Sequence, residues 1–359
     1  MVVLQLGPYP PPHGGVQTNL VAIREHLRRR GMGAPVINLT RHRAPERDEV
    51  YYPRSAGAVV RLLMKIPADV IHLHIGGRLS GRLLALCFFC TLLPGRRTVL
   101  TFHSGGYPSW QKGRRLLPFS LRGLILRRLD AILAVNTEIA SLFRTLGVLP
   151  SRIRLTCPFS PVSVAGDTVL PEPLASFAEA HHPLLTTVGL LEPEYDLAAQ
   201  IRMFADIRRE FPQAGLVIVG SGSLDQALRR QIAAHPAASH ILLCGDVAHP
   251  VTLKVLARSD AFLRTTLYDG DSISVREALQ LGVPVVATDN GMRPDGVHLI
   301  PRSDPSALLA MVRDVLKAPG HRSQSPERSD ASLDDLLDLY RSLVNPRSQG
   351  AARVPSTVL

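Results

Sequence analysis

Apolar segments that end in glycine-containing turns and continue into amphipathic helices recur along the chain. Residues 2–31 show one such unit, and residues 184–232 show two in succession. A strand, a tight turn and a helix in this order form the repeating unit of an open parallel sheet with helices on both faces. The chain has 359 residues, more than one hydrophobic core usually organises, so the pattern predicts two doubly wound α/β domains.

The stretch 265–289 (TTLYDGDSISVREALQLGVPVVATD) contains the most informative turn. Its pattern predicts a strand end, a polar loop, a short helix over 272–281 and a buried strand over 283–288. We expect Asp271 or Ser272 to cap the helix, because a short side-chain oxygen can accept hydrogen bonds from the amides of the first turn. The positive end of this helix would point out of the carboxyl edge of a sheet, where a phosphate group is stabilised.

Two acidic residues flank this predicted phosphate site. Asp269 lies in the loop and Glu277, eight residues later, lies on the helix. This spacing lets both carboxylates face one ligand and bind the hydroxyls of a sugar or a ribose. Spacing alone equally allows Asp269 to belong to an ordinary turn and Glu277 to be a solvated helix residue.

The segment resembles the E-x7-E signature of family 4 of retaining, nucleotide-sugar-dependent glycosyltransferases, with Asp269 in place of the first Glu and Glu277 as the second. The following residues, ALQLGVPVVATDNG, are similar to the family's EAMACGVPVVATDVGG. The resemblance covers about residues 1–345. It implies the GT-B fold, in which two Rossmann-like doubly wound domains face a central cleft and a C-terminal helix crosses back to the first domain.

The resemblance also implies a division of the chain. It comprises an acceptor-side domain over 1–165, a linker over 166–180, a nucleotide-sugar-binding domain over 181–328, a crossover helix over 329–345 and a polar tail over 346–359 that we expect to be disordered.

In the first half, glycine pairs and histidines follow the predicted strands. Gly14 and Gly15, with Gln17 beside them, match a loop that in the family faces the donor diphosphate. His103 in TFHSGG matches the family's His that contacts the donor sugar near its reacting carbon, and His74 in DVIHLHIGG is a candidate for acceptor contacts. A His at a strand end is more often structural, and the residues alone leave that alternative open.

The resemblance assigns a role to each candidate residue. Glu277 would bind the donor ribose, Asp269 the sugar hydroxyls, and the amides over 270–272 the sugar and phosphate. The implied catalytic residues are His103, Asp269 and Glu277; the implied donor-binding residues are Gly14, Gly15, Gly189, Gly245, Asp246, Val247, Gly270, Asp271, Ser272, Ile273 and Glu277.

The chain departs from the family after the predicted strand 184–188. Family members commonly have GRLVPEKG there, with an Arg and a Lys that neutralise the diphosphate, whereas this chain has Leu190 and Tyr195 at those positions. Charge-assisted contacts are worth about 1.5 to 3 kcal/mol each, so their loss should be costly. Either nearby cations compensate, or the chain does not turn over an ordinary nucleotide sugar. The candidate cations are Arg264, Arg276 and Arg293.

The implied reaction moves a sugar from a nucleotide-diphosphate sugar to a glycan or lipid-linked acceptor with retention, in bacterial cell-surface polysaccharide or glycolipid synthesis. The nucleotide sugar is a co-substrate; no cofactor is expected, and the absence of a metal-binding motif favours a metal-independent mechanism. The alternative is a non-catalytic GT-B subunit that binds a glycan, a lipid intermediate or a partner transferase. Sugar-nucleotide epimerisation is a weaker third option.

Charge is unevenly distributed along the sequence. Residues 1–165 carry 23 Lys and Arg against 7 Asp and Glu, and residues 166–359 carry 18 against 23. The basic half indicates an anionic partner. Basic and apolar residues interleave over 112–130, which favours a membrane surface; the alternative is a core-facing helix with a basic rim. Nucleic acid is not expected, because no binding motif accompanies the charge and aromatic residues are sparse.

Three further features concern the compartment. MVVLQLGPYP lacks the charged start of a secretory signal, and the apolar run 83–93 is eleven residues long, so it predicts a buried helix rather than a membrane span of roughly 20 residues. Cys87 and Cys90 lie within that run, which predicts core packing rather than metal or redox chemistry. The expected location is cytoplasmic, peripheral on the inner face of the cell membrane.

Overall fold

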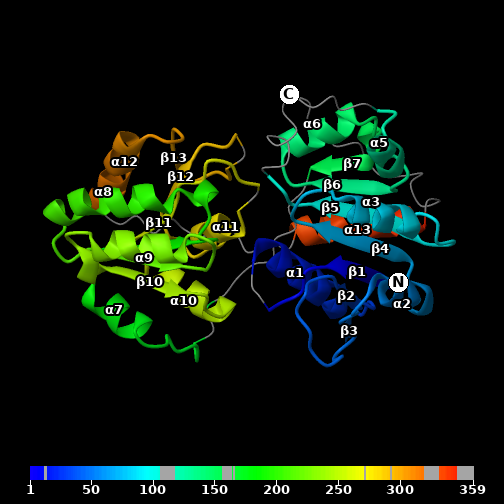
Figure 1. Cartoon of the computed structure of the whole chain (residues 1–359), viewed down its shortest axis with the longest axis horizontal. Helices are drawn as coiled ribbons and strands as arrows, with labels where there is room; N and C mark the ends of the chain where they lie inside the picture. Colours follow the sequence, from blue (N-terminus) through cyan, green and yellow to red (C-terminus); the bar gives the residue numbers. More distant parts are fainter. Residues whose placement is uncertain are drawn as a thin grey trace. The chain divides into compact units, whose positions relative to one another are not determined.

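The computed structural model describes residues 1–11, 14–105, 118–155, 164, 166–270, 272–291, 293–318 and 331–345 (Figure 1). Contacts divide the chain into two compact units. The first comprises residues 1–12, 16–160 and 330–359, and the second comprises residues 13–15 and 161–329. Each unit contains one parallel sheet, as the alternation of strand and helix patterns predicts.

The first unit has a seven-stranded sheet in the order β3-β2-β1-β4-β5-β6-β7, with every pair parallel. Its strands are β1 (Val3–Gly7), β2 (Val36–Asn38), β3 (Val50–Tyr51), β4 (Val70–Ile75), β5 (Arg97–Phe102), β6 (Ala131–Ala134) and β7 (Ile153–Leu155). Its helices are α1 (Gly15–Arg29), α2 (Ala56–Lys65), α3 (Gly81–Cys90), α5 (Leu121–Leu126), α6 (Thr137–Thr145) and α13 (Ala331–Val344), with a 3-10 turn at Pro150–Arg152.

The second unit has a six-stranded parallel sheet in the order β10-β9-β8-β11-β12-β13. Its strands are β8 (Leu184–Val188), β9 (Gly215–Val219), β10 (Ile241–Gly245), β11 (Ala261–Arg264), β12 (Val285–Thr288) and β13 (Val297–Ile300). Its helices are α7 (Leu174–Ala180), α8 (Leu197–Glu210), α9 (Asp225–Ala233), α10 (His249–Arg258), α11 (Ile273–Gln280) and α12 (Pro305–Lys317), with 3-10 turns at Pro193–Tyr195 and Ala238–His240.

Both strand orders are doubly wound. In each sheet the chain runs outward in one direction and then restarts beside the first strand, so the order reverses between β1 and β4 and again between β8 and β11. Ligands of open α/β sheets bind at the carboxyl ends of strands at such switch points. The segments that follow β1, β4, β8 and β11 are therefore the places to look for a site.

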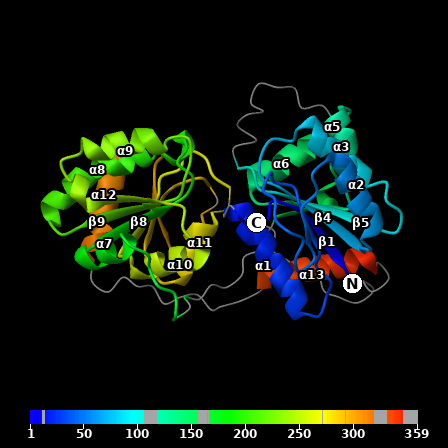
Figure 2. The same ribbon diagram turned by 60° about the horizontal axis from the view of Figure 1, so that its bottom comes forward.

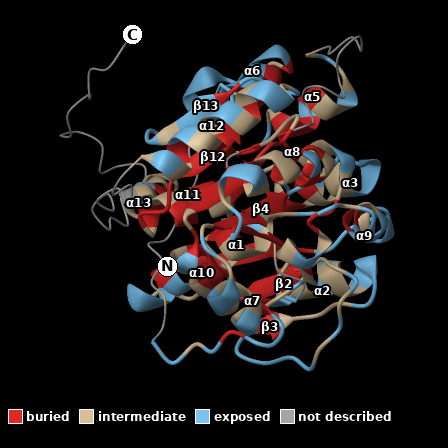
Figure 3. Ribbon diagram, turned by 90° about the vertical axis from the view of Figure 1, so that its left-hand side faces the viewer, coloured by how far each residue is buried: buried red, intermediate tan, exposed pale blue. Residues whose placement is uncertain are grey.

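Helices cover both faces of each sheet, and Figure 3 shows the buried residues concentrated in the strands and the helix faces against them. In the first unit, α2, α3, α5 and α6 pack on one face, while α1 and α13 pack on the other. In the second unit, α8, α9 and α12 cover one face, and α7, α10 and α11 the other.

Helix α13 confirms the predicted return of the chain to the first unit (Figure 2). Its buried side chains Leu333, Leu336, Leu337 and Tyr340 recur at helical spacing and join the same core as Val3 and Val70. Tyr340 is fully buried, and its hydroxyl lies 2.6 Å from Nδ1 of His72 on β4. The C-terminal helix is thus part of the first unit's hydrophobic core.

Two predictions need correction. The stretch 166–180, expected to be a linker without periodicity, contains α7, and Leu170 and Leu174 are buried in the core of the second unit. The run 83–93 does form a helix as far as Cys90, but Phe88 on it and Leu92 just after it are 40% and 52% exposed. The helix packs on one face of the sheet with the side that carries Cys87 and Cys90, so its other side stays exposed.

Cys87 and Cys90 are fully buried, and burial raises the pKa of each thiol to about 12, which confirms core packing. Among the described helices, none combines the length and the hydropathy needed to cross a membrane. The tail 346–359 lies outside the described residues.

Candidate functional site

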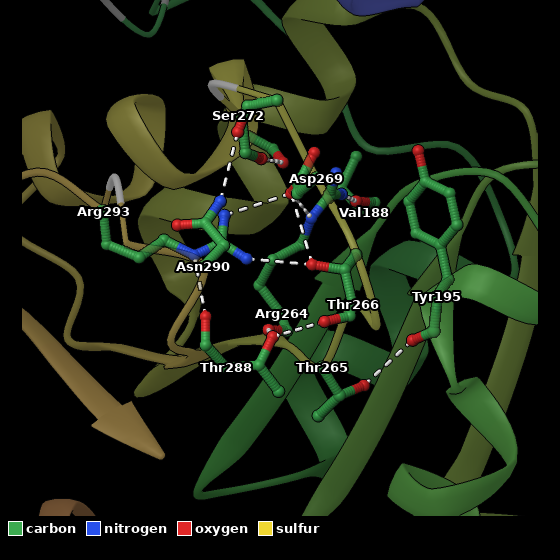
Figure 4. Close-up of polar contacts among 12 residues, drawn as sticks. Val188, Tyr195, Arg264, Thr265, Thr266, Asp269, Ser272, Thr288, Asn290 and Arg293 are labelled. Carbon is green, nitrogen blue, oxygen red and sulfur yellow. Dashed lines mark hydrogen bonds and ion pairs between the residues drawn. The ribbon is translucent and has the colours of Figure 1, made fainter. Parts of the chain in front are cut away.

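The centre of the candidate site is a buried ion cluster at the carboxyl edge of the second unit's sheet, formed by Arg264, Asp269 and Arg293 (Figure 4). Oδ2 of Asp269 lies 2.9 Å from Nε of Arg264 and 3.0 Å from Nη1 of Arg293. The side chains of Arg264, Asp269 and Arg293 are 7%, 13% and 2% exposed. Two guanidinium groups thus share one carboxylate, and the cluster carries one positive charge in excess.

This environment controls the protonation of Asp269. Burial alone would raise the pKa of its carboxyl, but the charges of Arg264 and then Arg293 outweigh burial and hold that pKa below its usual range. The carboxylate also raises the pKa of Arg264, in spite of the burial of the guanidinium. All three groups therefore remain charged at neutral pH.

Hydrogen bonds connect the cluster to three strand ends. Arg264, the last residue of β11, donates to the carbonyl of Val188 at the end of β8 at 2.8 Å. Arg293 donates to the carbonyl of Thr288 at the end of β12 at 3.0 Å and to Oγ1 of Thr266 at 2.9 Å. The cluster therefore fixes the loops that follow β8, β11 and β12 relative to one another.

Further polar contacts close the loop after β11. Oγ1 of Thr288 donates to the carbonyl of Thr266 at 2.6 Å, and Nδ2 of Asn290 donates to the carbonyl of Gly270 at 3.2 Å. These contacts hold the backbone over 266–270 in the position from which α11 starts. Thr266, Thr288 and Asn290 were not predicted from the sequence, although a polar residue at the end of a buried strand is a signal that could have identified Thr288.

Tyr195, which stands where the family has a Lys, contacts the same cluster. The guanidinium carbon of Arg264 lies 4.6 Å from the centre of the Tyr195 ring, within range of a cation–π contact. A Cβ on Gly189 would lie 2.2 Å from that ring, so only glycine fits there. Leu190, which stands where the family has an Arg, is 50% exposed. The structure thus places an arginine of β11 beside the position of the missing lysine.

Helix α11 starts directly after this loop. Ser272 occupies its N-cap position, but its side chain lies 3.1 Å from Oγ of Ser274 and caps no backbone amide, so the predicted capping by Ser272 is wrong. Asp271 lies outside the described residues. Gly282 ends the helix region with φ of +74°, as the expected glycine stop requires. Without a side-chain cap from Ser272, the first-turn amides beginning at Ile273 are suited to an anionic ligand.

Glu277 is buried on α11 rather than solvated. It is 3% exposed, and its Oε1 accepts a hydrogen bond from Nε2 of His249, the first residue of α10, at 2.6 Å. A carboxylate can accept up to four hydrogen bonds, so His249 orients Glu277 and leaves capacity for a ligand. His249 was missed, although a polar residue just after a turn at a parallel strand end is a recognisable signal.

The remaining candidates of the second unit lie at the same edge of the sheet. Gly245 ends β10 with φ of +75°, and Asp246 accepts a hydrogen bond from Oγ of Ser221 at 2.7 Å; Val247 is partly buried beside them. Arg276 is half-buried on α11. In the described residues, no group of His, Cys, Asp and Glu side chains is arranged to hold a metal ion.

In the first unit, the predicted histidines belong to a row of three imidazoles, in which His72 and His74 are buried and His103 is partly buried. The rings of His72 and His74 on β4 are 4.1 Å apart, and those of His74 and His103 are 5.9 Å apart and stacked. His72 bonds Tyr340 and Oγ1 of Thr101, both at 2.6 Å. Gly14 precedes α1 and Gly15 is its first residue, at the carboxyl end of β1, with Gln17 in the first turn.

Burial keeps these imidazoles neutral. It lowers the pKa of His72 to about 3 and that of His103 to about 4, and it lowers the pKa of His74 well below the ordinary value. Both ring nitrogens of His74 and Nε2 of His103 are buried and have no hydrogen-bond partner among the described residues. A neutral His103 can donate one hydrogen bond and accept another, but it offers no positive charge to a ligand.

Comparisons with known proteins complete this picture. The model of the glycosyl transferase 4-like domain matches residues 3–158, and that of glycosyl transferases group 1 matches residues 175–329, which together are most of the chain. The chain belongs to this family of GT-B glycosyltransferases. The resemblance of the stretch 265–289 is thereby confirmed at the level of the family.

Curated relatives are distant. An uncharacterised glycosyltransferase of Methanocaldococcus jannaschii is 34% identical over 25% of this chain and 21% of its own length, and glycogen synthase of Mycobacterium tuberculosis is 26% identical over 70% and 61%. A GDP-mannose-dependent phosphatidylinositol monomannoside mannosyltransferase of Mycolicibacterium smegmatis is 25% identical over 44% and 47%. The chain therefore spans less than two thirds of the length of these relatives.

Solved structures share the fold. HepE of Anabaena in complex with UDP-glucose has a TM-score of 0.69 at 16% identity, over 97% of this chain and all of that one. Sucrose-phosphate synthase of Thermosynechococcus elongatus has a TM-score of 0.68 at 18% identity, over 96% of this chain and all of that one. These matches confirm the GT-B architecture that the sequence predicts.

The ion cluster predicts a large effect of Asp269→Asn in this glycosyltransferase family member. The substitution leaves two buried guanidinium groups without a carboxylate, and breaking a buried pair from one side costs about 3 to 5 kcal/mol. The matched control is Asp225→Asn, which breaks an exposed pair with Arg229 and should cost no more than about 1 kcal/mol. Denaturant unfolding measures both, and equal losses would contradict the structural role of the cluster.

The histidine row predicts that acid destabilises the protein. The folded histidines titrate well below their ordinary pKa of about 6.5, so their contribution to stability is complete above pH 6.5 and is lost as the pH falls toward about 4. Between pH 7 and pH 5, His72 and His103 should each cost on the order of 2 kcal/mol of unfolding free energy. Removing one of them, by His74→Leu, should reduce the loss measured by unfolding at the two pH values. The exposed His298→Leu should leave it unchanged.

Proposed function

We propose that the protein transfers a sugar from a nucleotide-diphosphate sugar to a glycan or lipid-linked acceptor, with retention of anomeric configuration and without a metal ion. The observation that carries the proposal is the excess positive charge of Arg264, Asp269 and Arg293 next to the start of α11. A diphosphate is the part of such a donor that cations and helix amides would stabilise, first in binding and then as the leaving group.

The contacts of the second unit suggest how it would hold the donor. The amides over 270–273 would bind the sugar and phosphates, and Glu277, oriented by His249, would accept hydrogen bonds from the ribose hydroxyls. Asp269 is engaged by two arginines, so a contact with sugar hydroxyls would add to its ion pairs rather than replace them. His103 would contact the sugar as a neutral imidazole.

The positions of Arg264 and Arg293 support the proposal that these arginines compensate for the Arg and Lys that the chain lacks at Leu190 and Tyr195. Their excess charge lies at the same edge of the sheet, and the ring of Tyr195 stacks on Arg264. Charge that is fixed by a buried network before the ligand arrives needs no reorganisation during the reaction. Among the similar proteins, one is named as GDP-mannose-dependent and another was solved with UDP-glucose, which supports a nucleotide sugar as the donor.

We further propose that the acceptor belongs to bacterial cell-surface polysaccharide or glycolipid synthesis and that the protein works at the inner face of the cell membrane. The basic composition of residues 1–165 supports an anionic surface as partner.

The second candidate function is a non-catalytic GT-B subunit that binds a glycan, a lipid intermediate or a partner transferase. Leu190 and Tyr195 favour it, because a site that has lost its usual Arg and Lys is expected in a chain that no longer turns over a donor. This function predicts no release of nucleoside diphosphate with any donor, in the presence or absence of EDTA.

The proposed function predicts that Glu277→Gln lowers kcat/KM tenfold or more, because one charged hydrogen bond to the donor is worth about 1.5 kcal/mol. Uridine, guanosine and adenosine diphosphate sugars are first screened for release of the nucleoside diphosphate, and the variant is then assayed with the active donor. The matched control is Glu179→Gln, an exposed acid on α7 that should leave the rate unchanged. An unaltered kcat/KM for the Glu277 variant would refute the role of Glu277 in donor binding.

Retention is tested separately, by NMR of the anomeric centre of the product.

A further inference from the structure

Helices α3 and α5 are neighbours in the first unit (Figures 1 and 2). Exposed apolar side chains gather on these helices and in the residues next to them. Phe119, Leu121 and Leu124 are 82%, 72% and 48% exposed, and Phe88 and Leu92 are 40% and 52% exposed. We call these five residues, with the arginines beside them, the α3–α5 surface. Single exposed apolar residues are normal, but a cluster of them marks an interaction site.

The exposure follows from how α5 is anchored. Its other side places Ile125 and Leu126 in the core against the sheet. A Cβ on Gly123 would lie 2.3 Å from the carbonyl oxygen of Pro118 and 2.8 Å from that of Leu146, so the helix backbone packs tightly there. Rotating α5 to bury Leu121 and Leu124 would break this packing. Helix α5 therefore faces the core on one side with arginines at its rim, as the alternative predicts, and it also carries an exposed apolar side.

Arginines are interleaved with the exposed aromatic rings. The guanidinium of Arg127 lies 5.6 Å from the centre of the Phe119 ring, and that of Arg128 lies 5.7 Å from the Phe88 ring. Nε of Arg128 also donates to Oγ1 of Thr91 at 3.3 Å, which links the end of α5 to α3. Leu121, Leu124 and Arg128 follow one another at helical spacing. Apolar and cationic groups thus form one continuous surface.

The sequence around this surface has no negative charge. From residue 70 to residue 129 the chain contains ten Lys and Arg and neither Asp nor Glu. A two-fold contact with a second copy would set these cations against each other, because both copies present the same patch. An anionic bilayer meets both features: each cation near its surface is worth about 1 kcal/mol, and Phe and Leu side chains insert at the boundary of headgroups and acyl chains.

We propose that the α3–α5 surface docks the protein on an anionic lipid bilayer, with Phe119, Leu121 and Leu124 inserted and Arg122, Arg127 and Arg128 at the headgroups. The proposal rests on the proposed function for its purpose, which is to bring the enzyme to a lipid-linked acceptor. The docking itself needs no turnover.

Co-sedimentation with vesicles of phosphatidylcholine, alone or mixed with phosphatidylglycerol, tests the proposal. The full chain should bind the mixed vesicles and not the neutral ones. The triple variant Phe119→Ser, Leu121→Ser, Leu124→Ser should weaken binding tenfold or more, and Arg122→Gln with Arg128→Gln should do the same. Matched controls come from the second unit: Val169→Ser with Leu299→Ser, whose side chains are also exposed, and Arg209→Gln with Arg229→Gln. They should bind as the wild type does.

Three outcomes would overturn the proposal: wild-type binding by the triple variant, binding that ignores lipid charge, or self-association without lipid that the triple variant abolishes in sedimentation velocity. The last would assign the surface to contact between copies. Donor turnover in detergent-free buffer is measured in parallel. If the triple variant loses vesicle binding but keeps donor turnover, the result concerns the docking surface alone. If the wild type binds vesicles but releases no nucleoside diphosphate, the result counts against the proposed function alone.

Discussion

The carboxylate of Asp269 between Arg264 and Arg293 is the interaction on which the candidate site depends. A buried guanidinium is expensive unless a charge and hydrogen bonds compensate it. Here one carboxylate, two strand-end carbonyls and a threonine hydroxyl compensate two guanidinium groups. The network joins the ends of β8, β11 and β12 and leaves one positive charge in excess at the switch point of the sheet.

The other features of the second unit follow from this arrangement. Because Arg264 points back toward β8, Tyr195 can stack on it, and Gly189 is required beneath the Tyr195 ring. Because the loop over 266–270 is fixed, α11 begins at a defined place and carries Glu277 to His249. The chain that lacks the usual Arg and Lys thus still presents a cation, helix amides and an oriented carboxylate along one edge.

The architecture was predictable from the sequence, because a strand pattern, a glycine-containing turn and a helix pattern follow one another repeatedly along the chain. This order is typical of a parallel sheet with helices on both faces. Gly282 and the core positions of Cys87 and Cys90 followed from local chemistry. The directions of side chains did not. The spacing of Asp269 and Glu277 gave no sign that the first faces two arginines and the second a histidine 28 residues away. Contacts such as Tyr340 with His72, 268 residues apart, arise only from the tertiary fold.

Two local errors have different origins. Helix α7 lies among prolines and is too short to show a periodic pattern. The run that forms α3, like α5, carries apolar residues on more sides than the sheet can cover. Hydropathy along a sequence reports the amount of apolar surface, not which part of it finds a neighbour. The apolar side chains that stay exposed are informative for that reason, because they lie on a surface rich in arginine.

We propose that the second unit is a nucleoside diphosphate site whose charge comes from the cluster of Arg264, Asp269 and Arg293. Calorimetric titration of the wild type with UDP, GDP and ADP, each against its parent nucleoside, tests it most directly. The account predicts that at least one diphosphate binds tenfold or more tightly than its nucleoside, a difference of about 1.4 kcal/mol. Equal affinity of every pair, or no binding of any diphosphate, would contradict it.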